Sequence, residues 1–566
     1  MLRTLERRVR YLKHFWKILS LKERYFLIVL GTLFLVSSFF SLNLLWRSQT
    51  KELPEYGGTY REGIVGSPRF INPLLAPTND ADRDLTQLVF SGLMRYTSGG
   101  VPSADLAQTI EIKDGGKVYE FTLRDNITWH DGTPVGAEDI AFTIKLVQDP
   151  EYRSPLRINW QGVEVNILDE KRIQLILKTP YAPFLETTTM GILPKHIWED
   201  VTSQSFSLAP MNLKPIGNGP YQLKKFKKDR FGEIKEIWLV VDENYHLGRP
   251  LIANLVFKFF AGEEDMVTAY KQREIDGLAS VSPEHLKTIK EEKRLAPKEI
   301  FIPRYFAVFF NQTQSKPLSD INVRVALATA LDRDEIIQNV LEGKGVAADS
   351  PIPKGMKAYS ENIIHYPFSP DEARAVLDRA SWKDTNGDGV REKGEEKLEF
   401  TLVTTASQGL DRAAELLKNQ WGEIGANVNV EIINVGELQN DFIRPRNYQA
   451  LLFGEILGQE PDPFSFWHSS QKRDPGLNLS LYENKTVDKL LEEARQTPND
   501  EERIKKYAEF QNIITRDLPA IFLYSPSYIY PISKNLKGVE VTGVVDPSKR
   551  FSEVEKWYLE TRRVWK

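Results

Sequence analysis

The stretch from Tyr448 to Ser470 brings together residue types suited to binding a ligand. It begins with an apolar run, residues 450–453, whose length and closing glycine are typical of a buried strand. Two prolines then exclude a helix, and a loop held by a rigid strand is a common place for binding residues. We predict that seven residues here bind the ligand: Gly454, Glu455, Gln459, Glu460, Asp462, Phe464 and Trp467. The alternative is a proline-stiffened turn whose aromatic side chains fold into the core.

Residues 384–395, with the sequence DTNGDGVREKGE, fit the pattern of a calcium-binding loop. Calcium prefers oxygen ligands, and Gly389 permits the sharp turn that such a loop requires. The predicted ligands are Asp384, Asn386, Asp388 and Glu395. However, a strand rather than a second helix is expected from residue 397, and Arg391 replaces the usual apolar residue. A hairpin loop satisfied by its own backbone is therefore the alternative.

The patterns that suggest catalysis or phosphate binding have simpler structural explanations. His130 and Asp131 are adjacent, but they precede a glycine in a turn, where neighbouring side chains rarely point into one site. Gly217-x-Gly219 is followed by Pro220 and a strand-like segment instead of the helix N-terminus that a phosphate loop needs. The sequence contains neither G-x-S-x-G nor H-E-x-x-H, and it has no cysteine. The residues themselves therefore give no specific indication of a catalytic site or of a required cofactor.

Charge is unevenly distributed along the 566 residues. The formal net charge is −4, whereas residues 1–24 alone contain eight basic and two acidic side chains. The rest of the chain is therefore acidic, which argues against a nucleic-acid partner. The length suggests two or three domains, each with an ample core.

An uncharged and largely apolar run, residues 25–46, lies between Arg24 and Arg47. About 20 apolar residues span a bilayer, and Tyr25 and Trp46 stand where aromatic side chains favour the membrane interface. We predict a single-pass membrane anchor here. A cleaved signal peptide is the alternative, although the run is long and lacks a small-residue cleavage site.

The segments on either side of this run set its orientation. The basic residues 1–24 should stay cytoplasmic, and residues 1–22 have the spacing of an amphipathic helix on the inner leaflet. Residues 47–55 are polar and contain Pro54, so we predict a tether there. The remaining body should lie on the extracellular or periplasmic side.

The segment PDPFSFWHSSQ, residues 461–471, resembles the C-terminal signature of the family 5 extracellular solute-binding proteins, the receptors of peptide-type ABC importers. Residues 57–63 and 306–333 also resemble this family, and the likeness runs from about Tyr56 to Asn535. It implies an α/β, two-lobed periplasmic-binding-protein-like fold with an extra inserted domain. Lobe 1 would comprise residues 56–96, 207–305 and 515–566, the inserted domain 97–206, and lobe 2 residues 306–514.

The resemblance also implies a function, that of a binding protein which is not an enzyme and requires no cofactor. A peptide would bind between lobes that close by a hinge motion, and the receptor would deliver it to the permease subunits of an ABC transporter. Three alternatives remain at this point: a sensory ectodomain, a membrane-anchored hydrolase, and a receptor for another solute such as an oligosaccharide or a metal chelate.

The chain departs from the family in one respect that concerns the ligand. Relatives that fix a free α-amino group resemble one another in placing an aspartate a few residues after the glycine of the cleft strand. Counted from Gly454, these places hold Gly458 and Gln459, and the nearest aspartate is Asp462. A buried ammonium group without a carboxylate is costly. We therefore predict a peptide receptor that tolerates a blocked N-terminus, unless one of the glutamates at 455 and 460 takes the place of that aspartate.

Overall fold

The computed structural model describes residues 14–290 and 293–566, which form two compact units. The first unit contains the N-terminal residues up to Tyr56 together with Tyr558–Lys566, and the second unit is Gly57–Trp557. Each unit is described by itself below.

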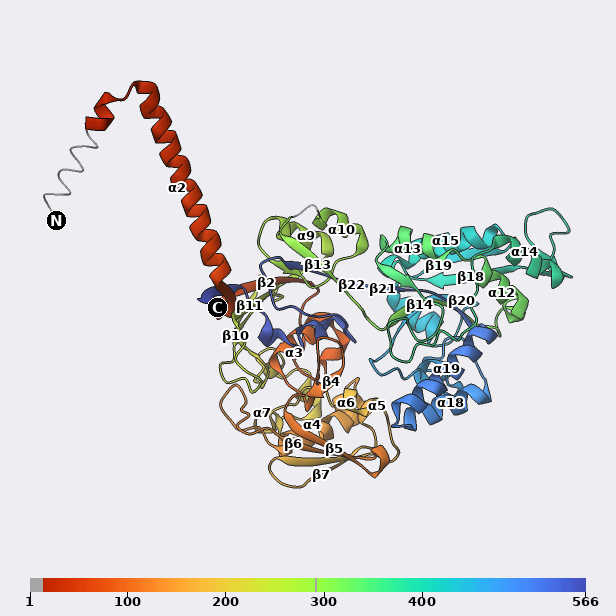
Figure 1. Ribbon diagram of the computed structural model, residues 1–566. Coiled ribbons are helices and arrows are strands. Elements are labelled where there is room, and N and C mark those ends of the chain that lie inside the picture. Colours follow the sequence, from red (N-terminus) through yellow and green to blue (C-terminus); the bar gives the residue numbers. More distant parts are fainter. Residues whose placement is uncertain (1–13, 291–292) are drawn as a thin grey trace. The chain divides into compact units, whose positions relative to one another are not determined.

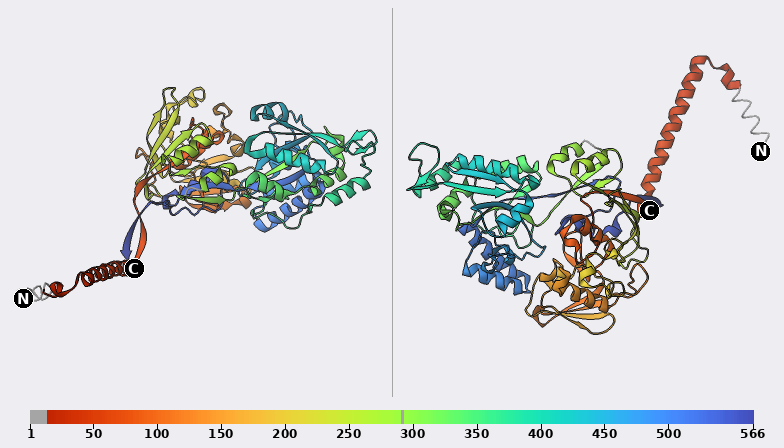
Figure 2. Two further views of the ribbon diagram at one scale, coloured as in Figure 1. Left: turned by 90° about the horizontal axis from the view of Figure 1, so that it is seen from above. Right: turned by 180° about the vertical axis from the view of Figure 1, so that it is seen from behind.

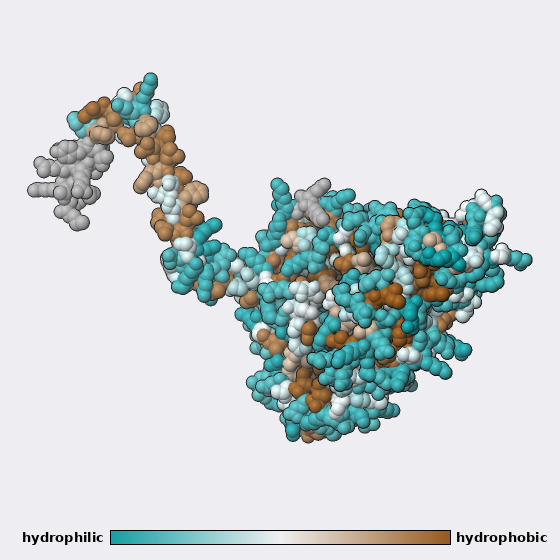
Figure 3. Space-filling model, turned by 45° about the vertical axis from the view of Figure 1, so that its right-hand side comes forward, coloured by the Kyte–Doolittle hydropathy of each residue, from teal (hydrophilic) through white to brown (hydrophobic). Residues whose placement is uncertain are grey.

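The first unit is built around a single long helix, α2 (Leu21–Gln49), drawn in red in Figure 1. Ser20 caps it, because its hydroxyl accepts the N–H of Glu23 while the Glu23 carboxylate accepts the N–H of Ser20. The helix is long and apolar enough to cross a membrane, and none of its residues is buried in the protein. Figure 3 shows apolar side chains all along its middle. Most of the amphipathic helix predicted for residues 1–22 lies outside the described residues.

A two-stranded antiparallel ribbon continues from this helix. Strand β1 (Thr50–Glu55) pairs with β23 (Glu560–Trp565), and the two strands run side by side in Figure 2. An ion pair of 2.6 Å joins Arg563 to Glu52 across the ribbon. The sequence predicts a polar tether at residues 47–55, but β1 forms there because a strand from the other end of the chain supplies its hydrogen bonds. No local pattern reveals such a partner.

The second unit begins with a five-stranded sheet that joins distant parts of the chain. Strand β2 (Gly57–Val65) pairs in parallel with β11 and β12, so residues 57–65 and 221–278 share one sheet. The strand order is β12-β2-β11-β10-β9, with β9 at Tyr221–Lys228, β10 at Ile234–Val241, β11 at Ile252–Phe260 and β12 at Gly277–Leu278. Helix α3 (Asp80–Val89) follows β2 and is capped by Asn79.

Two glycines and a histidine fix the chain where it crosses from the inserted domain back to the five-stranded sheet of lobe 1. The N–H of Gly219 donates to the carbonyl of Val89 at 2.8 Å, and a Cβ on Gly217 or Gly219 would overlap the backbone at the end of α3. The ring of His130 contacts the backbone of these two glycines, since its Nδ1 accepts the N–H of Gly217 and its Nε2 lies 3.0 Å from the carbonyl of Gly219. Asp131 pairs instead with His196. The His130–Asp131 pair is therefore a structural turn, as the sequence predicts.

The inserted domain contains its own four-stranded antiparallel sheet. The strand order is β5-β6-β8-β7, with β5 at Ala107–Lys113, β6 at Val118–Leu123, β7 at Glu164–Ile167 and β8 at Arg172–Ile176. Alternate residues of β6 are buried, as expected for a strand with one face on a core. Its helices include α4 (Ala137–Gln148), α5 (Arg157–Trp160) and α6 (Phe184–Thr187).

The second lobe is a six-stranded sheet covered by helices on both faces. The strand order is β15-β21-β14-β20-β18-β19, at Gly345–Ala347, Ala520–Pro526, Arg304–Phe310, Ala450–Ile456, Glu399–Thr404 and Asn427–Ile432. In β14, Val308 and Phe310 face one core, whereas Ala307 and Phe309 face the other. A strand that is buried on both faces has a continuous apolar sequence, which explains the apolar run at residues 450–453 of β20.

The helices of this lobe divide between the two faces of the sheet, as Figure 1 shows. One face is covered by α12 (Ile321–Thr329), α13 (Arg333–Leu341), α14 (Pro370–Arg379) and α15 (Leu410–Gly422). The other is covered by α18 (Lys485–Gln496) and α19 (Asp500–Asp517). Most of β14 and all of α12 fall within residues 306–333, one of the segments that resemble the family.

The chain leaves the second lobe later than the sequence predicts. Strand β21 pairs with β14 and β15, so residues 520–526 belong to the sheet of lobe 2 and not to lobe 1. The return begins with β22 (Tyr528–Ser533), which pairs with β13 (Leu295–Ile300). The predicted boundary at 515 was therefore too early. An apolar strand can lie at the centre of either sheet, and its sequence does not show with which strands it pairs.

Candidate functional site

The predicted binding loop leaves the end of β20, a strand in the interior of the sheet of lobe 2. Residues 457–463 follow this strand and lead into the single-turn helix α17 (Phe464–Trp467). The sheet and the prolines at 461 and 463 therefore hold the loop in place. The seven predicted residues lie at different depths around it.

Two of the seven, Glu455 and Trp467, lie in the core beneath the loop, and Gly454 is half-buried. Glu455 is buried and accepts the hydroxyl of Tyr305, and burial raises the pKa of its carboxyl group to about 8. Trp467 is also buried and packs against Phe309. A Cβ on Gly454 would lie 2.6 Å from the ring of Phe306, so this glycine makes room for core packing.

The other two carboxylates of the loop are held in ion pairs within lobe 2. Arg503 donates to Glu460 at 2.6 Å, and Arg495 donates to Asp462 at 2.7 Å. The Arg495 guanidinium also lies 4.2 Å from the centre of the Phe464 ring. The charges of Glu460 and Asp462 are therefore already compensated by arginines within the protein. Their role in ligand binding stays a prediction.

A residue that the sequence analysis missed, Glu186 of α6, connects the inserted domain to the loop. Its carboxylate accepts the N–H of Gln459 at 3.2 Å, the N–H of Glu460 and the hydroxyl of Tyr96 at 3.0 Å. A Cβ on Gly458 would lie 2.7 Å from the same carboxylate, so the approach requires glycine at 458. Burial raises the pKa of Glu186 to about 7, although these hydrogen bonds oppose the shift.

A second contact between the inserted domain and lobe 2 lies further along the same loop. The hydroxyl of Tyr181 donates to Asp462 at 3.1 Å, and the N–H of Ala182 donates to the carbonyl of Arg495. Asp462 thus bridges Tyr181 and Arg495. The loop 457–463 is therefore held from both domains.

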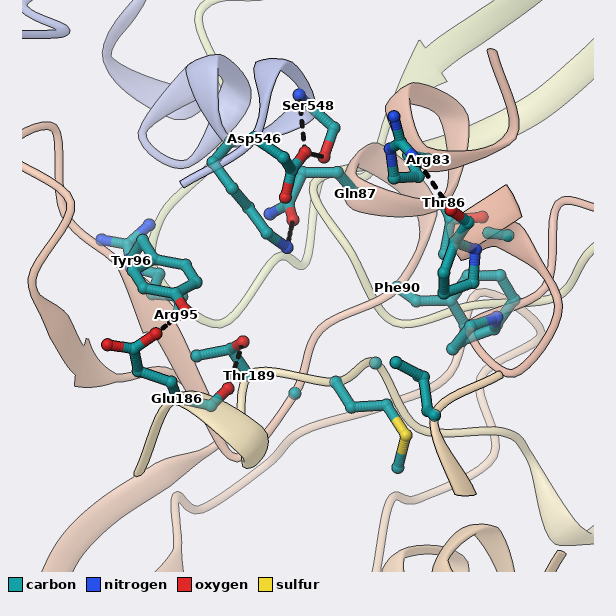
Figure 4. Close-up of a pocket in the computed structure, with 18 of the residues that line it drawn as sticks. Arg83, Thr86, Gln87, Phe90, Arg95, Tyr96, Glu186, Thr189, Asp546 and Ser548 are labelled. Atoms are coloured by element: carbon teal, nitrogen blue, oxygen red, sulfur yellow. Dashed lines mark hydrogen bonds between the residues drawn. The ribbon is translucent and has the colours of Figure 1, made fainter. Parts of the chain in front are cut away.

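Glu186 also lines a cavity of about 260 Å3, shown in Figure 4. Three stretches of the chain form its wall: residues 73–105, residues 156–191 and residues 545–549. In Figure 4, Tyr96 and Glu186 lie on one side, Asp546 and Ser548 on another, and Arg83, Thr86 and Phe90 on a third. Glu186 thus lines the cavity and also contacts the predicted loop, although none of the seven predicted residues lines the cavity itself. Sequence reasoning missed the cavity, since no short pattern links stretches so far apart.

The predicted calcium loop is a hairpin whose side chains bond within the loop. Asp384 accepts the N–H groups of Gly387 and Gly389, and Asp388 forms an ion pair of 2.7 Å with Lys397. No group of three or more His, Asp or Glu side chains that could hold a metal ion occurs among residues 14–290 and 293–566. Calcium binding at this loop stays a prediction, and it would require Asp388 to release Lys397.

If residues 384–395 bind calcium, millimolar calcium should raise the melting temperature of the full chain, because an ion that binds only the folded state stabilises it. The double substitution Asp384→Asn and Asp388→Asn should abolish this rise, whereas Asp441→Asn, an exposed control elsewhere in the lobe, should leave it unchanged. A melting temperature that responds to neither calcium nor chelator would dismiss the site.

Comparisons with known proteins agree with this architecture. A family model for bacterial extracellular solute-binding proteins, family 5 (middle region), matches residues 101–477. The oligopeptide-binding protein AppA of Bacillus subtilis (strain 168) is 28% identical over 517 residues, which cover 89% of this chain and 92% of AppA.

Two solved structures resemble the chain over most of its length. The structure of AppA from Bacillus subtilis in complex with a nonapeptide has a TM-score of 0.72 at 27% identity and covers 90% of this chain and 100% of its own. The structure of NikZ from Campylobacter jejuni in complex with Ni(L-His) has a TM-score of 0.73 at 28% identity and covers 88% and 99%. The fold and the family implied by the sequence are thus confirmed: this chain belongs to the bacterial extracellular solute-binding proteins of family 5.

Proposed function

We propose that this chain is a membrane-anchored receptor that captures peptides at the site formed by loop 457–463 and the adjoining cavity, and delivers them to an ABC permease. The observation that carries the proposal is the meeting of loop and cavity at Glu186, in a fold that resembles a receptor solved with a nonapeptide. Relatives of this kind are substrate-binding proteins of transport systems, and binding requires no catalytic group.

The ion pairs of the loop support tolerance towards the peptide N-terminus. A receptor that requires a free α-amino group needs a carboxylate to pair with it. Glu460 and Asp462 are already paired with arginines, and Glu455 is buried beside Tyr305. We infer that the peptide binds mainly through its backbone groups and through exposed parts of the loop near Phe464.

A metal chelate is the second candidate ligand. The cavity of about 260 Å3 is slightly smaller than the pockets of about 300–1,000 Å3 that enclose whole small molecules. A compact ligand would fill it, and NikZ, with a similar fold, was solved with Ni(L-His). In this case the chelator would supply the metal ligands.

The proposal can be tested with full-length protein purified from its own membranes in mild detergent. We expect mass spectrometry of the co-purified ligand to find peptides. Calorimetry with one peptide, free or acetylated at its N-terminus, should give affinities within about tenfold of each other. A sugar or a metal chelate in place of peptides would contradict the peptide assignment. A larger loss on acetylation would contradict only the tolerance.

The same preparation reports on the anchor and on the partner. If α2 is retained, the intact mass should include residues that precede Arg24, whereas a mature chain that starts after Trp46 would show cleavage. The proteins that co-purify should include ABC permease subunits. Recovery of a sensor kinase in their place would favour the sensory alternative.

A further inference from the structure

The cavity beside Glu186 contains a lysine whose charge has no close partner. Lys549 belongs to the 3₁₀ segment Pro547–Phe551, and its ammonium group donates to the side-chain oxygen of Gln87 at 2.6 Å. It lies 5.7 Å from the centre of the Tyr96 ring. In the part of the chain that the structure describes, no carboxylate lies within 4.0 Å of it. An ammonium group has three donors, so two remain for a ligand.

Other donors on the same wall also have no acceptor. The Nε of Arg95 and the hydroxyl of Thr86 are buried without a hydrogen-bond partner among the described residues, and both side chains line the cavity. Buried polar groups are nearly always hydrogen-bonded, so unpaired ones call for a ligand or water. The wall thus contains two buried polar atoms without a partner, although another nitrogen of the Arg95 guanidinium donates to Glu555 at 2.9 Å.

The acidic side chains that line the cavity already accept hydrogen bonds from groups other than Lys549. Asp105 pairs with His246 at 2.7 Å, Asp546 accepts the N–H and hydroxyl of Ser548, and Glu186 accepts hydrogen bonds from loop 457–463. Burial lowers the pKa of Lys549, and the nearby Asp546 opposes this shift. An anion that entered the cavity would compensate the ammonium group of this half-buried lysine.

We propose that this cavity is a subsite for one carboxylate of the ligand, which Lys549 binds with the help of Thr86 and Arg95. The inference rests on the proposed receptor function and adds the chemistry of the ligand to it. With about 260 Å3, the cavity is too small for a whole peptide and suits one side chain or one chain end. The carboxylate comes either from an acidic side chain or from the peptide C-terminus.

The test compares three variants of the full chain in detergent. Lys549→Met keeps most of the aliphatic stem and removes the charge, and Lys549→Arg keeps the charge. Lys214→Met changes an exposed lysine of the same lobe and serves as the control. The probes are alanine pentapeptides with one Glu or one Gln at each position, each with a free or an amidated C-terminus.

We expect calorimetry of the unmodified protein to show a preference of about tenfold or more for the carboxylate, since hydrogen bonds to charged groups are stronger than neutral ones. A preference for Glu over Gln identifies a side chain, and a preference for the free C-terminus identifies the chain end. Lys549→Met should remove the preference, while Lys549→Arg and Lys214→Met should keep it. Peptide binding with the same preference in Lys549→Met and in the unmodified protein would overturn the subsite and leave the receptor function intact.

A small probe separates this inference from the receptor function itself. If no pentapeptide binds, the peptide assignment fails, and glutarate then tests the subsite alone. A melting temperature that glutarate raises in the unmodified protein but not in Lys549→Met supports the subsite. An equal response in both proteins overturns it.

Discussion

Replacing Arg550 by methionine should lower the free energy of unfolding by about 3–5 kcal/mol, the usual cost of leaving buried charges without their partner. The Arg550 guanidinium is fully buried between two carboxylates, Glu62 of β2 and Asp84 of α3. It donates to Glu62 at 2.5 Å and to Asp84 at 2.6 and 2.8 Å. Without it, two buried acids would face each other in the core of lobe 1.

Chemical denaturation of the full chain measures this effect. The matched control is Arg172→Met, because Arg172 pairs with Asp169 at 2.7 Å on an exposed surface, where such pairs contribute less than about 1 kcal/mol. Adding Glu62→Gln and Asp84→Asn to Arg550→Met should recover part of the loss, since no unpaired charge then remains. Equal losses of unfolding free energy for Arg550→Met and Arg172→Met would show that the buried ion cluster contributes no more to stability than an exposed ion pair.

Peptide affinity should fall as the pH rises through about 7, because Glu186 titrates there. In the contact described here, burial raises its pKa to about 7, whereas a hydrated glutamate titrates near 4.3. If the lobes separate during ligand release, Glu186 becomes hydrated, so closing takes up a proton. The closed form is then fully favoured below the pKa of the open form, and this advantage is lost as the pH rises through 7.

Calorimetry between pH 5.5 and 8.5, with a peptide blocked at both ends, measures this linkage. Between pH 5.5 and about 7 the affinity of the unmodified protein should fall by up to about tenfold per pH unit, and above pH 7 it should level off, since Glu186 is then deprotonated in both forms. Glu186→Gln should remove this dependence. The control Glu199→Gln, at an exposed position of the same domain, should keep the pH dependence, because it leaves Glu186 and its neighbours Tyr96 and Glu460 unchanged. A pH dependence that persists in Glu186→Gln would rule out this carboxyl group.

The sequence predicts those parts of the fold that are encoded by local pattern. The run at 450–453 became the buried strand β20, and the family likeness gave two lobes with an inserted domain. It did not predict the partner of residues 520–526, because strand pairing depends on residues far away in the chain. The same limit explains why a tether was expected at 47–55, most of which forms β1 (Thr50–Glu55).

The site divides in a similar way. The loop 457–463 could be located from its prolines, acids and aromatic residues, but the depth of each side chain could not. Trp467 and Glu455 proved to be buried, because the residues that cover them come from other strands and helices. Glu186 and Lys549 gave no signal at all, since their importance arises from neighbours 274 and 462 positions away.

The pairing of β1 with β23 has a consequence for the order of events during synthesis. A six-residue ribbon rises about 20 Å, and its hydrogen bonds make it much stiffer than a single polar strand. If α2 anchors the chain in a membrane as proposed, residues 50–55 emerge early, whereas residues 560–565 are made only after all of Gly57–Trp557. Domains fold as units while synthesis proceeds. We therefore expect residues 57–557 to fold while residues 50–55 are still a single flexible strand, and the stiffer ribbon to form only after residues 560–565 have been made.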